Sequence, residues 1–344
     1  MTGKLHVLVP FWGLAGGVIK VLDYAEHGVE AGFDVTLWSE SDHSDAATIA
    51  SLPVLQRLLS HGVTHRRLDE LPGLGLTSDD RVLFSEPAHA AVIDRTTAKL
   101  GQVIHLVQGT RHATPTWNSG LHFRLLHRPL VRVVVSDQVR EAIDPHVNTR
   151  LPVHTVIEGH DIDYFAAPRS PKPNAIARVL YSTWKSDLGD RVAELVDPQV
   201  ATFIAMRGSV DWPTLRNRYQ NADIFLGTPG PEEGFYLPGL EAMAAGCAVV
   251  MSLVGGNAAY GESEVNMIAC PYDDAAAHAT ALIGLAGDAQ RRQALVTAGR
   301  QAADRHRLDR ERDEAIAIMR EPLGNYDDGP PPAQRERNDD GDTR

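Results

Sequence analysis

Short apolar runs alternate with stretches of helical periodicity along the first half of the chain. Six runs rich in Val, Leu, Ile and Phe lie at 4–11, 34–38, 81–85, 103–108, 132–136 and 154–157. The apolar residues between the first two runs recur at helical spacing, at Ile19, Leu22, Ala25 and Val29. We therefore predict a parallel sheet over residues 1–166 that helices cover on both faces.

The alternation starts again after a proline-rich hinge at 167–174. Apolar runs predict a second sheet of about five strands, and the clearest of them lie at 178–182, 202–206, 222–227 and 249–252. Helical periodicity then predicts helices at 274–285, 290–305 and 309–319. We expect a second α/β domain over 175–305 and a final helix within 306–321. The tail 322–344 contains PPP, six acids and three basic residues, so we expect it to be disordered.

Composition narrows the class of protein. The 344 residues are 43% hydrophobic and carry a formal charge of −12, which suits two ordinary domains and argues against a general nucleic-acid binder. Cys247 and Cys270 lie in apolar runs, which predicts buried, reduced thiols. The sequence has neither a charged-then-apolar leader nor a run of about 18 apolar residues. We expect a cytoplasmic protein without a membrane span.

The most informative pattern lies where an apolar run of the second domain meets a helix. A turn of Thr, Pro, Gly and Pro at 228–231 ends the strand, and Pro238 suits the first turn of a helix. The amides of 234–237 then point free N–H groups outward, which favours binding of an anion such as a diphosphate. Glu233 before the helix and Glu241 within it are candidates to accept hydrogen bonds from sugar hydroxyls. Two acids at this spacing also fit solvated acids at a helix start.

The stretch 233–250, EGFYLPGLEAMAAGCAVV, resembles the donor-site signature of the retaining GT-B glycosyltransferases of glycosyltransferase family 4, E-G-F-G-L-P-x-L-E-A-M-A-x-G-x-P-V-V. It departs at Tyr236, where the family has glycine, and at Ala248, where the family has proline. Residues 16–39 resemble the family's N-terminal GG-helix-GHxVT motif. The resemblance implies an α/β GT-B fold, in which two Rossmann-like, doubly wound parallel-sheet domains face a central cleft. It also implies that the final helix crosses back to the first domain.

The resemblance implies a role for each residue on the donor side. Glu233 would contact the transferred sugar, and Glu241 would hold the ribose. Backbone amides after Glu233 would contact the sugar and the diphosphate, and they belong to Gly234, Phe235, Tyr236 and Leu237. Gly16 and Gly17 would let the backbone of the first domain approach the donor phosphate from the opposite side.

A cation that neutralises the leaving diphosphate is expected after the first strand of the second domain, where Lys185 fits. Trp184 stands near the place where family members often have Arg, so Arg207 is predicted as the second cation. On the acceptor side, the phrase VQGTRH resembles a subgroup of the family. By that match Gln108 and His112 are candidates to touch the acceptor or the sugar.

Residues 111–140 contain five arginines and a single acid. The arginines are Arg111, Arg124, Arg128, Arg132 and Arg140. In an acidic protein this local excess predicts a surface for an anionic acceptor, or for peripheral contact with lipid headgroups on the inner face of a membrane. It fits an ordinary solvated helix equally well.

The segment 159–165, GHDIDYF, resembles the family's interdomain element N-G-V-D-x-x-x-F, with departures at Glu158 and His160. Asp161 and Asp163 form a D-x-D pattern, which binds metal in the other glycosyltransferase fold. Carboxylates near a linker more often cap helices, so we expect no metal site here.

The function that the resemblance implies is transfer of a sugar from a nucleotide-diphosphate sugar to a hydroxyl of a glycan, lipid-linked or small-molecule acceptor, with retained anomeric configuration. The donor is a co-substrate, and no cofactor is expected. Lys185 and the helix tip would stabilise the departing diphosphate, which takes the acceptor proton in a front-face displacement, while Glu233 orients the sugar. A GT-B sugar-nucleotide epimerase and a non-catalytic nucleotide-sugar-binding scaffold are the alternatives. A dehydrogenase does not fit, because the glycine spacing at 13–17 differs from G-x-G-x-x-G.

Overall fold

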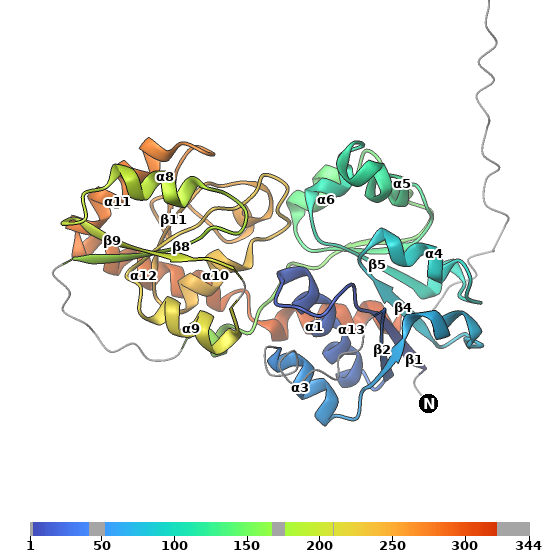
Figure 1. Ribbon diagram of the computed structural model, residues 1–344. Helices are drawn as coiled ribbons and strands as arrows, with labels where there is room; N and C mark the ends of the chain where they lie inside the picture. The colour runs from blue at the N-terminus through green and yellow to red at the C-terminus, as the bar shows by residue number, and fades with distance from the viewer. Residues whose placement is uncertain (1–2, 41–51, 167–175, 209, 322–344) are drawn as a thin grey trace, which may run out of the picture.

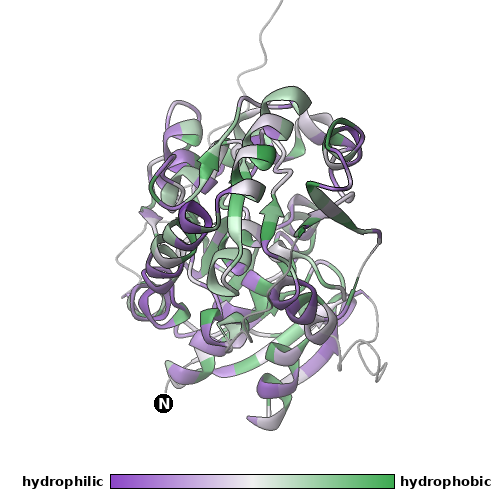
Figure 2. Cartoon of the chain, turned by 90° about the vertical axis from the view of Figure 1, so that its left-hand side faces the viewer, coloured by the Kyte–Doolittle hydropathy of each residue, from purple (hydrophilic) through white to green (hydrophobic). Residues whose placement is uncertain are grey.

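The computed structural model describes residues 3–40, 52–166, 176–208 and 210–321. The chain forms two lobes, each built on its own parallel sheet with helices on both faces (Figure 1). The hinge predicted at 167–174 and the tail from 322 lie outside the described residues. Figure 2 shows the apolar strands in the interior of the lobe that faces the viewer, whereas the outer helices are largely hydrophilic. Buried hydrophobic side chains therefore form a core on both faces of each sheet.

The first sheet has seven parallel strands in the order β3-β2-β1-β4-β5-β6-β7. The strands are β1 Lys4–Leu8, β2 Asp34–Ser39, β3 Thr64–Arg67, β4 Arg81–Phe84, β5 Val103–Val107, β6 Val131–Val134 and β7 Val153–Thr155. The six predicted strands are all present. The strand β3 was missed because its sequence THRR is polar, which suits an edge strand that is exposed to water.

Helices cover both faces of the first sheet and connect its strands. They are α1 Gly16–Glu30, α3 Pro53–Ser60, α4 Ala90–Ile93, α5 Leu121–Leu126 and α6 Asp137–Ile143. The short helix α7 Ile162–Phe165 follows the last strand, and its buried residues pack on the core of the second domain. Short 3-10 helices lie at η1 Leu68–Gly73, η2 Pro87–His89, η3 Leu100–Gln102, η4 Thr110–Ala113 and η5 Trp117–Gly120. The helix α1 is buried on every side from residue 18 to residue 28, so it is an internal helix rather than an amphipathic surface helix.

The second sheet has five parallel strands, as predicted, in the order β12-β11-β10-β8-β9. They are β8 Ala177–Ser182, β9 Ala201–Met206, β10 Ile224–Leu226, β11 Ala248–Met251 and β12 Ile268–Ala269. The helices of this domain are α8 Leu188–Leu195, α9 Trp212–Gln220, α10 Leu237–Ala244, η6 Gly255–Ala259, α11 Ala275–Gly287 and α12 Ala289–Asp304. Cys247 and Cys270 are buried free thiols, which confirms the prediction. In the part of the chain that the structure describes, no helix combines the length and the apolar character needed to cross a bilayer.

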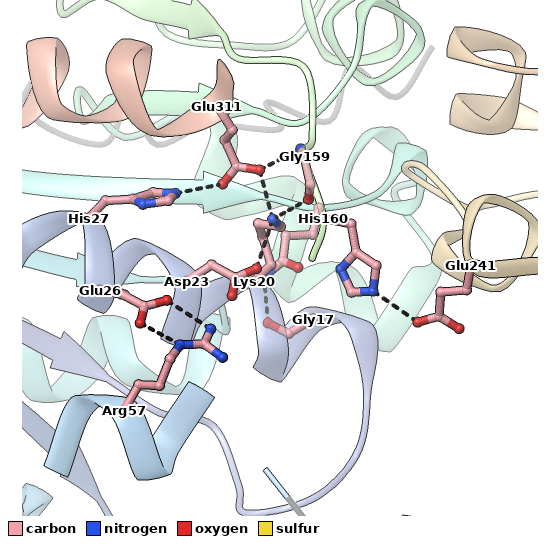
Figure 3. Close-up of polar contacts among 11 residues, drawn as sticks. Gly17, Lys20, Asp23, Glu26, His27, Arg57, Gly159, His160, Glu241 and Glu311 are labelled. Atoms are coloured by element: carbon pink, nitrogen blue, oxygen red, sulfur yellow. Dashed lines mark hydrogen bonds and ion pairs between the residues drawn. The ribbon is translucent and has the colours of Figure 1, made fainter. Parts of the chain in front are cut away.

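The last helix, α13 Leu308–Arg320, returns to the first domain and packs against α1 (Figure 1). A buried group of polar residues joins the two helices to the segment between the domains (Figure 3). We call it the Lys20 cluster, and it comprises Lys20, Asp23, His27, Gly159 and Glu311.

Lys20 is completely buried at the centre of this cluster. Its Nζ donates to Glu311 Oε2 at 2.7 Å, to the Gly159 carbonyl at 2.7 Å and to Asp23 Oδ2 at 3.0 Å. The Gly159 amide donates to the same Glu311 oxygen at 2.6 Å. Burial by itself would lower the pKa of Lys20, but the carboxylates of Asp23 and Glu311 raise it above its ordinary value, so the ammonium is charged. The charge of Lys20 therefore holds α13 on the first domain.

Replacing Lys20 by Met is expected to lower the free energy of unfolding by about 3–5 kcal/mol, because it leaves buried carboxylates without their cation. Urea denaturation followed by circular dichroism measures the loss. The control is Arg312→Met on the exposed side of α13, where Arg312 pairs with Glu30 at 3.2 Å. That surface pair contributes less than about 1 kcal/mol. Equal losses in the two variants would show that the Lys20 cluster has no special role.

Candidate functional site

A cavity of ≈ 350 Å³ lies between the two domains. Its wall from the first domain includes Gly16, Gly17, Gln108, Arg111 and Glu158, and its wall from the second domain includes Trp184, Lys185, Tyr219 and the run from Glu233 to Pro238 with Glu241. In the second sheet the strands β8 and β10 are neighbours although the chain leaves them in opposite directions. Ligands of doubly wound sheets bind beyond the carboxyl ends of strands at such a point, so the cavity is where this fold places a ligand.

The turn after β10 positions the start of α10. Tyr236 adopts a left-handed conformation with φ of 65°, which a tyrosine rarely does. Two hydrogen bonds hold it, since the Thr228 amide donates to the Tyr236 hydroxyl at 3.0 Å and the Tyr260 hydroxyl donates to the Tyr236 carbonyl at 2.7 Å. Tyr236 stands where the family has glycine, and it keeps the left-handed backbone conformation that glycine adopts easily. The helix starts at Leu237 with Pro238 in its first turn, as predicted.

Lys185 and Glu233 are in direct contact beside this turn. The Lys185 ammonium donates to Glu233 Oε1, and the Gly230 amide reaches the same oxygen at 3.3 Å. Lys185 follows β8 and Glu233 follows β10, so the neighbouring strand ends bring them together. The two residues that the resemblance implicates in catalysis thus occupy one site.

Backbone contacts fix the loop that carries Glu233 against the first domain. Residues Gly109 and Glu233 form an isolated β-bridge, and the Ser136 hydroxyl donates to the Gly234 carbonyl at 2.8 Å. A Cβ atom at Gly234 would lie 2.2 Å from the Gln108 carbonyl oxygen, so only glycine fits. The loop that the resemblance assigns to the donor is therefore part of the contact between the domains.

Glu241 lies inside α10, as predicted, and only 4% of its surface is exposed. His160 Nε2 lies 3.1 Å from one carboxylate oxygen, and the Tyr219 hydroxyl donates to the other at 3.0 Å. On the opposite wall, the Gln108 amide donates to the Gly17 carbonyl at 3.1 Å. Gly16, Gly17, Gln108 and Glu241 therefore face the same cavity.

The side chains of two predicted site residues are not part of the cavity wall. Arg207 pairs with Asp190, with Nη2 2.8 Å from Oδ1, and its side chain is not part of the cavity wall. His112 is 1% exposed and lies between His105 and His122, with ring centroids 5.6 Å and 4.4 Å away, so it does not reach the cavity either. Burial and the neighbouring rings lower the pKa of His112 well below its ordinary value.

The arginine-rich segment also differs from the prediction. Arg132 is completely buried, and its guanidinium donates to backbone carbonyls such as that of Leu125 at 2.8 Å. Arg128 pairs with Asp94, and Arg140 pairs with Asp144. The number of arginines therefore overstated how basic this surface is, because several of the guanidinium groups are bound to carboxylates or carbonyls of the protein itself. Arg111 is different, because it lines the cavity.

The D-x-D pattern has a structural role. Asp161 accepts a hydrogen bond from the Tyr164 amide at 3.2 Å at the start of α7, as expected for a helix cap, and Asp163 pairs with Arg307. Within the described residues, no group of three or more His, Cys, Asp or Glu side chains is arranged to hold a metal ion.

Glu158 belongs to the cavity wall, although the sequence did not predict it as a site residue. Its side chain lines the cavity and is 5% exposed. Burial raises the pKa of Glu158 to about 8, although the nearby Lys20 opposes the shift. The group is thus mainly a neutral acid at pH 7. The sequence offered one signal for this residue, because the interdomain element of the family has asparagine where this chain has Glu158.

The fold defines the class of this protein. Two doubly wound parallel-sheet domains that meet over a cavity, with the final helix returned to the first domain, form the predicted GT-B fold. The structure of the Anabaena protein Alr3699/HepE in complex with UDP and glucose is similar, with a TM-score of 0.71 and 12% identity over 92% of this chain and 99% of that chain. Sucrose-phosphate synthase from Thermosynechococcus elongatus matches with a TM-score of 0.65 and 16% identity over 92% of this chain and 98% of that chain.

Comparisons of sequence point to one group within that fold. Residues 139–288, less than half of the chain, match the family model described as Glycosyl transferases group 1. The D-inositol 3-phosphate glycosyltransferase of Saccharomonospora viridis is 32% identical over 139 residues, which are 40% of this chain and 31% of that protein. The matched part of the chain therefore spans less than a third of the length of this curated relative.

Replacing Glu158 by Gln is expected to change how stability depends on pH. The folded protein holds the Glu158 proton up to about pH 8, whereas the unfolded chain releases it near 4.5. Because the folded state binds more protons between these values, this group makes the free energy of unfolding fall as the pH rises through that window. Glu158→Gln lacks this fall, so its stability relative to the wild type should increase from pH 4.5 to pH 8 in urea denaturation. A constant difference across the window would contradict the prediction.

Replacing Gly256 by Ala is expected to disrupt the loop at Glu233, because a Cβ at Gly256 would lie 1.4 Å from the Gly234 carbonyl oxygen. Overpacking of this kind lowers the free energy of unfolding by about 1–3 kcal/mol. The control is Gly284→Ala in α11, where a Cβ meets nothing within 4 Å and should stabilise the helix by about 0.5–1 kcal/mol. Thermal and urea denaturation of both variants tests the pair, and a neutral Gly256→Ala would contradict the close approach.

Proposed function

We propose that this protein is a glycosyltransferase that moves a sugar from a nucleoside-diphosphate sugar to a hydroxyl acceptor. The observation that carries the proposal is the convergence of Lys185, Glu233, Glu241 and the start of α10 on one cavity between two GT-B domains. An ammonium and free helix amides suit a diphosphate, and the carboxylates suit the hydroxyls of a sugar and a ribose. The similar Anabaena protein was crystallised in complex with UDP and glucose, which supports this class of donor.

The contact between Lys185 and Glu233 suggests how the donor binds. A diphosphate carries more negative charge than one carboxylate, so it competes with Glu233 for the Lys185 ammonium. When the ammonium moves to the diphosphate, Glu233 becomes free to accept hydrogen bonds from the sugar. The two groups thus stay paired with each other until the donor takes the place of Glu233 beside the ammonium.

We propose further that the reaction retains the anomeric configuration by front-face displacement, as in glycosyltransferase family 4. The bond from the anomeric carbon to the diphosphate breaks, the bond to the acceptor oxygen forms, and the acceptor proton passes to the departing diphosphate. Lys185 and the amides of α10 stabilise the negative charge that develops on the leaving group. No metal takes part in this scheme. The resemblance in the donor signature supports this assignment.

On the first-domain wall, Arg111 lines the cavity and suits an acceptor that carries a negative charge. We propose that such an acceptor approaches from that side, next to Gln108. We propose that peripheral contact of this cytoplasmic enzyme with a membrane or an anionic acceptor depends on Arg111, because Arg132, Arg128 and Arg140 serve contacts within the fold.

A non-catalytic nucleotide-sugar-binding scaffold is the second candidate. The structure offers one reason for it, because Arg207 pairs with Asp190 and Trp184 stands 70% exposed where family members often have a cation. Among the residues that the structure describes, Lys185 would then be the one cation of the second domain's wall, which weakens stabilisation of a leaving group.

The test is nucleotide release from UDP-, GDP- and ADP-sugars by the full chain, with and without a panel of hydroxyl acceptors. Release that depends on acceptor is expected, and Glu233→Gln and Lys185→Met should each lower it by about 10²–10³-fold, the usual effect of removing one group that stabilises developing charge. The control is Arg191→Met, which removes an exposed cation of the same domain that pairs with Asp187 and Asp273. It should leave release unchanged.

The remaining outcomes separate the alternatives. Release without acceptor supports the epimerase, and donor binding without any release supports the scaffold. Proton NMR of the product gives the anomeric configuration, and inversion would contradict the proposed stereochemistry. Activity that chelation with EDTA abolishes would contradict a metal-independent reaction.

A further inference from the structure

Both oxygens of the Glu241 carboxylate have hydrogen-bond partners within the protein. Its two oxygens are engaged separately, one by His160 Nε2 at 3.1 Å and the other by the Tyr219 hydroxyl at 3.0 Å. Glu241 lies on α10, Tyr219 lies on α9 and His160 lies in the segment between the domains. Figure 3 shows the His160 ring turned toward Glu241. The carboxylate is thus held by side chains from two other elements.

The hydrogen bond between His160 and the Glu241 carboxylate requires the tautomer of His160 that carries its proton on Nε2. Nδ1 of the same ring is buried and has no hydrogen-bond partner among the residues that the structure describes. A proton on Nδ1 would be a buried donor without an acceptor, which is unfavourable. The favoured tautomer therefore donates from Nε2 to Glu241, and the orientation of the ring is set by this contact.

The position of His160 is itself determined by both domains. Its amide donates to the His306 carbonyl at 2.9 Å, and the Leu308 amide donates to the His160 carbonyl at 3.0 Å. The preceding residue, Gly159, is bound by Lys20 of α1 and by Glu311 of α13 (Figure 3). The ring stacks on Phe165 with centroids 5.6 Å apart. The His160 ring therefore has little freedom to turn away from Glu241.

Each carboxylate oxygen has two lone pairs, so one contact per oxygen leaves a further acceptor position on each. Glu241 and Tyr219 line the cavity, so these positions are available to a ligand there. Two neighbouring hydroxyls on one ring match two oxygens of one carboxylate. A ribose presents such a pair, and a carboxylate that rotates freely would lose entropy on binding it.

We propose that His160 and Tyr219 are positioning residues that fix Glu241 with its two oxygens toward the vicinal hydroxyls of a bound ribose. This inference rests on the proposed function, because it takes the ligand to be a nucleoside diphosphate. It assigns a role to the histidine at which the chain departs from the interdomain element. It also implies that the affinity for the nucleotide depends on α1 and α13, which hold residues 159 and 160 in place.

Isothermal titration calorimetry on the full chain tests the proposal. UDP, GDP and ADP are titrated first, and the tightest of them is then compared with its 2′-deoxy and 3′-deoxy forms. In the wild type each missing hydroxyl should weaken binding about tenfold, which corresponds to one hydrogen bond to a charged group. In Tyr219→Phe and His160→Leu, the same deletions should weaken binding by less than about threefold, because Glu241 is no longer oriented.

Two further variants separate positioning from general stability. His160→Gln keeps an amide donor for Glu241 and should restore most of the sensitivity to ribose hydroxyls. Tyr181→Phe is the matched control, since Tyr181 also donates its hydroxyl to a carboxylate of the second domain, that of Asp190, and does not line the cavity. It should keep the wild-type sensitivity.

A full tenfold effect of the missing hydroxyls in Tyr219→Phe would overturn the positioning role while leaving the proposed function intact. If the wild type binds none of UDP, GDP and ADP, the proposed function fails and this inference fails with it. Should His160→Leu not fold by circular dichroism, Tyr219→Phe decides the question alone, because it removes one hydroxyl and keeps the ring.

Discussion

The charge on Lys20 is the interaction on which the rest of the arrangement depends. A buried ammonium requires carboxylates around it, and Glu311 of the last helix supplies one of them at 2.7 Å. The end of the chain is therefore held against its beginning, and the segment at Gly159 is held between them. An apolar contact would tolerate sliding of α13 along α1, whereas hydrogen bonds to fixed atoms define one position. This position sets where the two sheets stand on either side of the cavity.

The cavity itself is built from strand ends and close backbone contacts. Lys185 and Glu233 meet because β8 and β10 are adjacent, and the bridge between Gly109 and Glu233 joins the loop to the first domain. Gly234 permits that approach since a Cβ would collide with the opposite backbone. The site is thus formed by both domains, and a change in their relative position alters it directly.

Apart from Arg111 on the wall from the first domain, the charged groups around the cavity fall into three kinds. Lys185 and Glu233 neutralise each other and can exchange partners when an anion enters. Glu158 is kept mainly neutral at pH 7 by burial, which raises its pKa to about 8. Glu241 is oriented by two donors. A pocket with one exchangeable pair, one neutral acid and one oriented carboxylate suits a ligand that combines an anionic centre with hydroxyls on both sides.

Local patterns in the chain were sufficient for both sheets apart from β3, for the turn and helix that carry Glu233 and Glu241, and for the buried thiols, because these features depend on residues a few positions apart. Tertiary structure alone decided the partners of single polar side chains. Arg207 is paired with Asp190 and His112 is buried, whereas His160 reaches Glu241 across 81 positions of the chain. Periodicity carries no information on such distant contacts, which arise only when separate elements pack. The strand β3 was missed for a related reason, since an edge strand needs no apolar face of its own once its neighbour supplies hydrogen bonds.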